Sequence, residues 1–213
     1  MKKVLCVVAL MAVLSFPAHA EKMKLNPYLG FDLQRSIYDY NSNYDIGGGV
    51  VLNGNTLLED SLDGFNIHVG NRFHENFGVE FGYFRTKEEG KNIVAGTTIG
   101  PGVVAAANFS TDVKIQGVTL DGLGYFPLGV EKRFELIGTV GISWSKADLA
   151  LTVPGVGSDN VDESEFGFRV GGGGQVTITD HINFRGLARY QTADFDNVVD
   201  NAWILGFGLN YAF

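Results

Sequence analysis

The stretch "WILGFGLNYAF", residues 203–213, decides the fold class. Every second residue is large and apolar, whereas the residues between are mostly small; the large set is Trp203, Leu205, Phe207, Leu209, Tyr211 and Phe213. A period of two is typical of a β-strand with one apolar face. Chain ends usually fray, so an unbroken apolar stripe at this position predicts a strand that is paired with another strand.

The same alternation returns in seven earlier stretches, so the sequence predicts eight strands in all. The seven are residues 27–38, 65–73, 77–84, 118–126, 134–144, 166–178 and 182–191. In each stretch large apolar residues alternate with charged residues, small polar residues or glycine. The stretch 118–126 fits both phases, and we place Asp121 on the inner face.

The predicted connections alternate between short and long. Short turns such as "HEN" (74–76) and "TDH" (179–181) alternate with long segments, which are residues 39–64, 87–112, 146–163 and 192–201. An even number of strands with short turns at one end and long loops at the other is typical of an up-and-down β-barrel of the bacterial outer membrane.

A soluble ligand-binding barrel of eight strands is the competing fold, and it would carry its large apolar residues inside. Here the face opposite the apolar stripes carries charges among glycines, which suits the narrow interior of a membrane barrel. The charged set is Arg72, Glu80, Asp121, Glu135, Arg169, Arg185 and Arg189. Residues 203–213 are also long enough to cross an apolar band of about 25 Å when tilted. The sequence therefore predicts an all-β, eight-stranded antiparallel transmembrane barrel.

The N-terminus predicts export. Lys2 and Lys3 precede an apolar run, and Ala18 and Ala20 frame a small-residue cleavage site, as in a secretory signal peptide. We expect residues 1–20 to be the signal peptide and residues 21–213 to be one barrel domain. The single cysteine, Cys6, falls in the signal peptide, which excludes disulfides from the mature chain. The net charge of -8 argues against nucleic acid as a partner.

Residues 24–213 resemble the small outer-membrane β-barrels typified by the OmpA transmembrane domain and the opacity-type, porin-like proteins. The resemblance rests on the signal peptide, on "DGLGYFPL" (121–128) before a short turn, and on the terminal aromatic-x-aromatic strand. It implies a location in the cell outer membrane of a Gram-negative bacterium, with both termini periplasmic. It also implies that the barrel-assembly machinery recognises the alternating set from Trp203 to Phe213. OmpA-type proteins continue into a peptidoglycan-binding domain, so cell-wall anchoring is not carried over to a chain that stops at Phe213.

The seven inward charges are the candidate site, because a low-dielectric interior tolerates charges only when they are paired. We expect them to form an ion-pair network that plugs the barrel, with Arg72 and Glu80 paired diagonally across a hairpin. No cofactor or metal site is expected, since the acidic residues 194–200 lack the spacing of a calcium-binding EF-hand loop. His68 reads as an inward structural residue near Glu80 or Asp121.

Three functions remain open on the sequence. The first is a structural or surface-interaction role, adhesin-like, in which the long loops meet an extracellular partner; residues 92–109 are unusually apolar for such a loop. The second is a small pore, and the third is an enzyme that modifies the acyl chains of lipid A or phospholipids, with His68 as its base. We favour the first, with no catalysis, and expect outer-membrane lipids, lipopolysaccharide and the assembly machinery as further partners.

Overall fold

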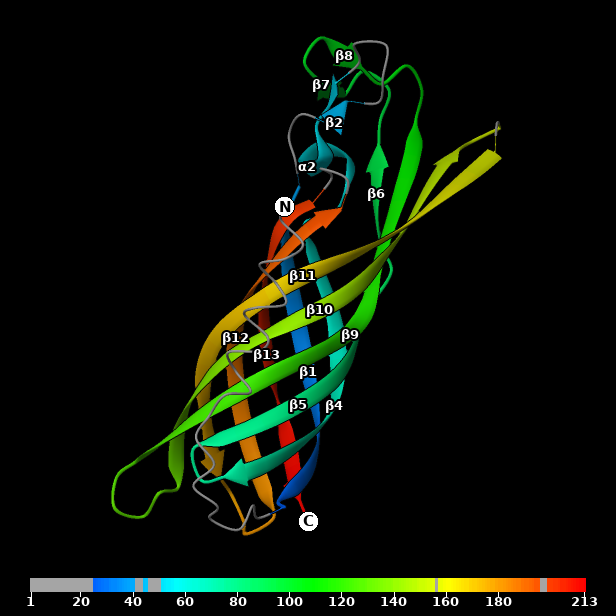
Figure 1. Cartoon of the computed structure of the whole chain (residues 1–213). Helices are drawn as coiled ribbons and strands as arrows, with labels where there is room; N and C mark the ends of the chain where they lie inside the picture. The colour runs from blue at the N-terminus through cyan, green and yellow to red at the C-terminus, as the bar shows by residue number, and fades with distance from the viewer. Residues whose placement is uncertain (1–24, 41–43, 46–50, 156, 196–198) are drawn as a thin grey trace.

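The computed structural model describes residues 25–40, 44–45, 51–155, 157–195 and 199–213. Within these residues eight long antiparallel strands close into a ring (Figure 1), which confirms the predicted barrel. In chain order they are β1 (Pro27–Tyr40), β4 (Ser61–His74), β5 (Phe77–Thr86), β9 (Phe109–Leu128), β10 (Phe134–Val153), β11 (Gly157–Thr177), β12 (Ile182–Phe195) and β13 (Val199–Ala212). The predicted signal peptide lies outside the described residues.

The first and last strands close the ring. β13 pairs antiparallel with β1 from Tyr28 opposite Ala212 to Tyr40 opposite Val199, and with β12 on its other side. The backbone N–H of Phe213 donates to the carbonyl of Pro27 at 3.1 Å. The C-terminal stretch is thus hydrogen-bonded on both edges, which is why an apolar stripe can run to the end of the chain without a core to cover it.

The apolar residues face outward and the polar residues face inward. All six large residues of the terminal stretch are exposed, with exposed fractions from 40% for Leu205 to 73% for Phe213. By contrast Asp32, Glu80, Asp121 and Arg185 are each at most 2% exposed. This is the reverse of a soluble barrel and is the pattern that a lipid environment requires. In the stretch with two possible phases, Thr119, Asp121, Leu123 and Tyr125 point inward.

Short turns join the strands at the end where the C-terminus lies, and the other end carries the larger connections (Figure 1). Because the short turns of such barrels face the periplasm, the larger connections lie outside the cell. They contain the short elements β2 (Tyr44–Asp45), β3 (Val51–Leu52), α2 (Gly54–Leu57), β6 (Glu89–Ile93), β7 (Thr98–Gly100) and β8 (Val103–Val104). No helix in the described part of the chain has the length and apolarity that crossing a membrane requires.

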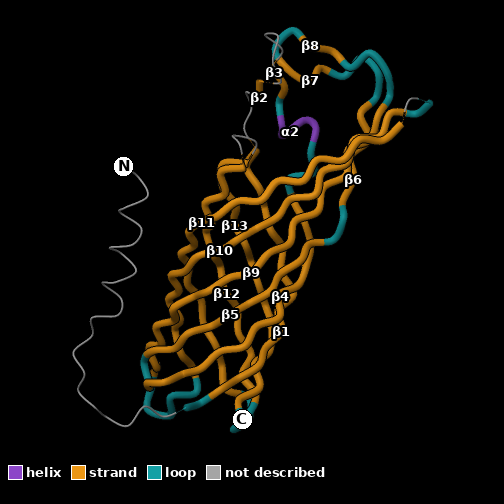
Figure 2. Tube along the Cα trace, turned by 45° about the vertical axis from the view of Figure 1, so that its right-hand side comes forward, coloured by secondary structure: helices purple, strands orange, loops and turns teal. Residues whose placement is uncertain are grey.

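The interpretation of residues 146–163 as a long loop is wrong. β10 and β11 remain paired up to Val153 opposite Gly157, so only residues 154–156 connect them. Both strands leave the ring and project beyond it (Figure 2). The sequence obscured this hairpin because the apolar residues change face beyond Trp144, where Ala147 is buried while Lys146 takes the outer face. The partner stretch of β11, residues 157–165, is mostly acidic and polar and shows no apolar alternation.

Candidate functional site

The interior of the barrel is organised around Arg185 of β12. Its Nε and Nη2 donate to the two carboxylate oxygens of Asp32 at 3.0 and 2.6 Å, and its Nη1 donates to Glu80 at 2.6 Å. Asp32 lies on β1 and Glu80 on β5, so one guanidinium ties three strands together across the lumen. Bonds between ions of this kind are short and strong. We call Asp32, His68, Glu80 and Arg185 the central cluster.

His68 completes the central cluster as a structural residue. Its Nε2 lies 2.8 Å from Oδ1 of Asn210, while Nδ1 lies 3.3 Å from Nδ2 of Asn66 and 3.1 Å from Nη2 of Arg185. An imidazole with its proton on Nε2 satisfies all three contacts, because Nε2 then donates and Nδ1 accepts. His68 is 1% exposed. It lies near Glu80, one of the two acids expected beside it, with the shortest N–O distance 3.7 Å.

Two further arginines neutralise a pair of acids that the fold places side by side. Glu80 of β5 and Asp121 of β9 are direct cross-strand neighbours, an arrangement that is unfavourable for like charges. Arg189 lies 3.5 Å from Glu80 and Arg169 lies 3.3 Å from Asp121. Glu80 thus has an arginine from β12, on the opposite side of the ring, and Asp121 has one from β11, which is separated from β9 by β10 alone.

Glycines on the neighbouring strands make room for these bulky groups. A Cβ at Gly30 would overlap with Nε2 of His68, and one at Gly141 would overlap with Oδ1 of Asp121. The glycines between the charges in the sequence are therefore part of the same arrangement, since a side chain there would displace a member of the cluster or its neighbour.

The predicted pair of Arg72 and Glu80 is wrong. Arg72 of β4 instead donates to Glu135 of β10, with 2.7 Å between Nη2 and Oε1, and its guanidinium lies 4.2 Å from the ring centroid of Tyr125. The pairing of β4 with β5 shifts register between Asn71 and His74. This irregularity breaks the simple diagonal geometry of the hairpin, and Glu80 is taken by the arginines of β12.

An apolar plug fills the extracellular end of the lumen. Its members are Tyr38, Tyr40, Leu58, Leu62, Phe84, Val113, Ile115, Ala147 and Ala202, each at most 9% exposed. Leu58 follows α2 directly, so the first extracellular connection folds down onto the plug. The hydroxyl of Tyr40 donates to the carbonyl of Glu59 at 2.9 Å, and burial raises the pKa of this phenol well above its usual value.

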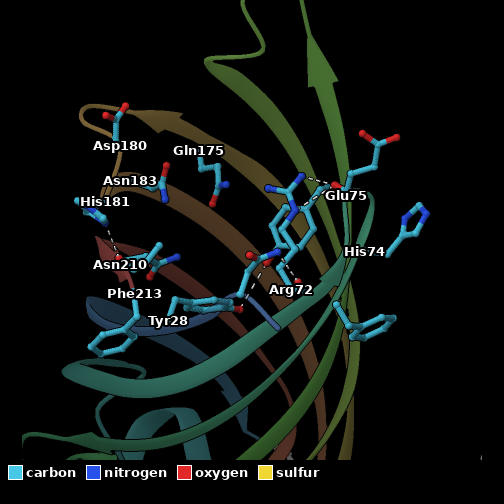
Figure 3. Close-up of a pocket in the computed structure, with 14 residues that line it drawn as sticks. Tyr28, Arg72, His74, Glu75, Gln175, Asp180, His181, Asn183, Asn210 and Phe213 are labelled. Carbon is cyan, nitrogen blue, oxygen red and sulfur yellow. Dashed lines mark hydrogen bonds between the residues drawn. The ribbon is translucent and has the colours of Figure 1, made fainter. Parts of the chain in front are cut away.

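An open cavity of about 870 Å³ occupies the periplasmic end (Figure 3). Tyr28, Gln175, Asn183 and Asn210 point into it, and His181 and Asp180 stand at its rim. The hydroxyl of Tyr28 donates to Glu80 at 3.0 Å, so the floor of the cavity is bonded to the central cluster. Among the described residues no group of three or more His, Cys, Asp or Glu side chains is placed to hold a metal ion.

The structure thus brings the seven predicted charges into two groups. Arg185, Arg189, Glu80, Arg169 and Asp121 lie in or beside the central cluster, whereas Arg72 and Glu135 form a separate pair nearer the periplasm. Sequence reasoning missed Asp32, which receives two bonds from Arg185. Its signal was present, because Asp32 alternates with Phe31 and Leu33 in a predicted strand.

Comparisons with known proteins agree with the fold. The sequence matches the profile of the outer membrane protein beta-barrel domain over residues 6–213. A comparison with curated proteins finds no match. Among solved structures, the outer membrane protein OprG from Pseudomonas aeruginosa is similar, with a TM-score of 0.56, 14% identity, and 89% of this chain and 97% of that chain covered.

Two more structures are similar at the same level. A major outer membrane protein from Thermus thermophilus gives a TM-score of 0.56 at 12% identity, with 87% of this chain and 99% of that chain covered. Neisserial surface protein A gives 0.52 at 16% identity, with 88% and 97% covered. At these identities the structural likeness shows the fold, while the profile match shows the family. The chain belongs to the outer membrane protein beta-barrel domain family and resides in the bacterial outer membrane.

Proposed function

We propose that this protein acts at the cell surface as an interaction protein, and that its barrel serves as a closed anchor without catalytic activity. The observation that carries the proposal is the contrast between the two halves of the molecule. The lumen is filled by the central cluster and by the apolar plug, whereas the extracellular part is built from paired strands.

The extracellular strands begin where the lipid-facing stripe ends. Trp144 of β10 and its cross-strand neighbour Phe166 are 63% and 50% exposed, and the next residues on the same outer face, Lys146 and Ser164, are polar. At roughly 3.3 Å per residue, the strand continues for about 30 Å past Trp144. A projection of this length carries its outer surface away from the membrane, where a partner can reach it.

The tip of the β6–β9 connection exposes apolar side chains to water. Val94 and Val104 are 61% and 54% exposed. Isolated exposed valines are common, but these two lie in a segment that also contains the partly exposed Val103 and the exposed alanines 106 and 107. Segments of this kind at the outermost point of a surface protein favour contact with another molecule.

Attachment of whole cells tests the proposal. Cells that express the protein should attach to serum-protein-coated plates several-fold better than cells without it. The double substitution Val94→Ser and Val104→Ser should remove most of that gain. The control is Val130→Ser, because Val130 is fully exposed in the short turn at the opposite end of the barrel. Attachment no better than that of cells lacking the protein would reject the surface role.

A pore is the second candidate, and the observation in its favour is the periplasmic cavity, which reaches the hydroxyl of Tyr28. The central cluster and the apolar plug argue against a pore, because both close the lumen on the extracellular side of this cavity. Refolded protein in planar bilayers should give no discrete current, and Arg185→Ala or Arg189→Ala is the variant most suited to open one. Steady single-channel steps from the wild-type protein would show that the lumen conducts.

The acyl-modifying enzyme has less support. His68 is buried within the central cluster, and its ring nitrogens lie beside Asn210, Asn66 and Arg185. A catalytic base needs a free nitrogen within reach of a nucleophile. The lipid profile of overexpressing cells should therefore match that of cells carrying His68→Ala.

A further inference from the structure

The projecting hairpin has one open edge. β11 pairs with β10 along residues 157–176, but β12 pairs with β11 only from Arg169 to Thr177. Phe168 is the last residue of β11 that bonds to β12, and from there toward the tip no described strand pairs with β11 on the side away from β10. The opposite edge of the projecting sheet is different, because β6 pairs with β9 at residues 109–113. Figure 1 shows β10 and β11 leaving the ring away from β12.

The backbone groups of this edge point away from β10. The N–H of Phe168 donates to Oγ1 of Thr192 on β12 at 2.9 Å, so Phe168 directs its backbone to the β12 side. Backbone direction alternates along a strand, so Phe166, Ser164 and Asp162 direct their N–H and C=O groups to the same side. Such a row is a template for one more strand.

The negative charge of the open edge of β11 indicates which kind of strand can bind there. Residues 157–168, "GSDNVDESEFGF", contain four acidic residues and no lysine or arginine. Lys146 of β10 pairs with one of them, Asp162, at 2.9 Å, so the edge keeps an excess of negative charge. Pairing with the same edge of a second copy would set these acids against each other, and like charges on opposed strands are unfavourable. The whole chain is also acidic, with a net charge of -8. A segment rich in lysine or arginine is therefore attracted, while a second copy is repelled.

We propose that the open edge of β11, residues 162–166, binds an extended basic peptide segment of an extracellular protein as an added β-strand. The inference rests on the proposed surface role and names the kind of partner. Backbone hydrogen bonds to Phe166, Ser164 and Asp162 align the segment, and the acidic side chains select its charge.

Peptide binding to the purified protein in detergent tests the edge directly. The probe is a fluorescent ten-residue peptide of alternating lysine and threonine, measured by anisotropy. It should bind at least tenfold more tightly than a peptide of alternating glutamate and threonine. It should also bind at least tenfold more tightly than the lysine peptide N-methylated at every second residue, which keeps the charge and removes the backbone donors. Equal binding of the methylated peptide would show attraction by charge alone and would overturn the proposal.

Ser164→Pro is the matching protein variant. Proline at this position removes a donor from the open side and leaves the bonds to β10 intact, as prolines at sheet edges do. It should weaken binding at least tenfold, and Ser164→Ala should leave it unchanged. Unchanged binding by Ser164→Pro would reject this edge. Cell attachment through Val94 and Val104 tests the surface role, whereas peptide anisotropy tests binding at the edge of β11. The two proposals can therefore fail independently.

Discussion

Arg185 is the residue on which the interior depends. Its guanidinium is 1% exposed and neutralises two carboxylates that have no access to water. Replacing a whole buried ion pair by apolar groups is often harmless, but removing one partner leaves an uncompensated charge. Asp32 and Glu80 would both be left in this position, with His68 and Arg189 as the remaining neighbours.

Arg185→Met should therefore lower the free energy of unfolding by about 3–5 kcal/mol. Urea unfolding in lipid vesicles, followed by the fluorescence of Trp144 and Trp203, measures this loss. The control is Arg133→Met, because Arg133 is exposed near the short turn; its effect should stay within about 0.5 kcal/mol. Equal stability of the two variants would mean that the central cluster does not hold the barrel together.

At the scale of elements, side chains tie strands together that are not hydrogen-bonded neighbours. β4 and β10 lie apart in the order of the ring, yet Arg72 and Glu135 connect them, and Gln175 of β11 donates to the same carboxylate at 2.6 Å. The apolar plug connects β1, β4, β5, β9, β10 and β13 at the other end. The ring is thus braced from within at both ends, in addition to its backbone ladder.

A double-mutant cycle of Arg72→Met with Glu135→Gln should give a coupling of about 1 kcal/mol, because the pair is partly exposed and is screened by water. The same cycle with Glu80→Gln should give a coupling within about 0.5 kcal/mol of zero, since Arg72 does not pair with Glu80. The measurement is again urea unfolding in vesicles. A larger coupling to Glu80 than to Glu135 would contradict the observed pairing.

At the scale of the whole molecule, the two halves of the structure face different solvents. The wall presents apolar residues to lipid, and the barrel strands are paired on both sides along the part that crosses the membrane, on β11 as far as Arg169. In hydrocarbon this closure is obligatory, because an unpaired backbone group has no water to bond. β11 loses its second neighbour at the upper end of the lipid-facing stripe, and its edge is open from there outward among the described residues.

Because the C-terminal strand closes the ring, we expect its last residues to be needed for assembly. Deleting Phe213 should reduce the folded fraction in the outer membrane more than replacing residues 95–107 by a short linker, while transport across the inner membrane continues. The readout is the gel mobility of unboiled against boiled samples, since a folded barrel migrates differently. A folded fraction unaffected by the deletion would show that the terminal aromatic is not an assembly signal.

Single residues differ in how far the sequence alone specifies their positions and partners. The strand count and the outward face followed from a period of two, because lipid on one side and a narrow polar lumen on the other impose it along every strand. Asp121 was placed inward correctly, although its stretch fits both phases. The pairing of Arg72 could not be predicted, because a register shift at residues 71–74 depends on how two strands meet. Asp32 was missed as a partner of Arg185 because 153 residues separate the two.

The sequence by itself determined the barrel, the outward face of each strand and the composition of the interior. Each of these is a local consequence of which residues face lipid. Only the tertiary structure decided which charges pair, where the lumen is closed and which edge stays open. These properties depend on distances across the ring between strands far apart in the chain. "WILGFGLNYAF" contains the pattern of a closing strand, but it closes the barrel only by pairing with β1 on one side and β12 on the other.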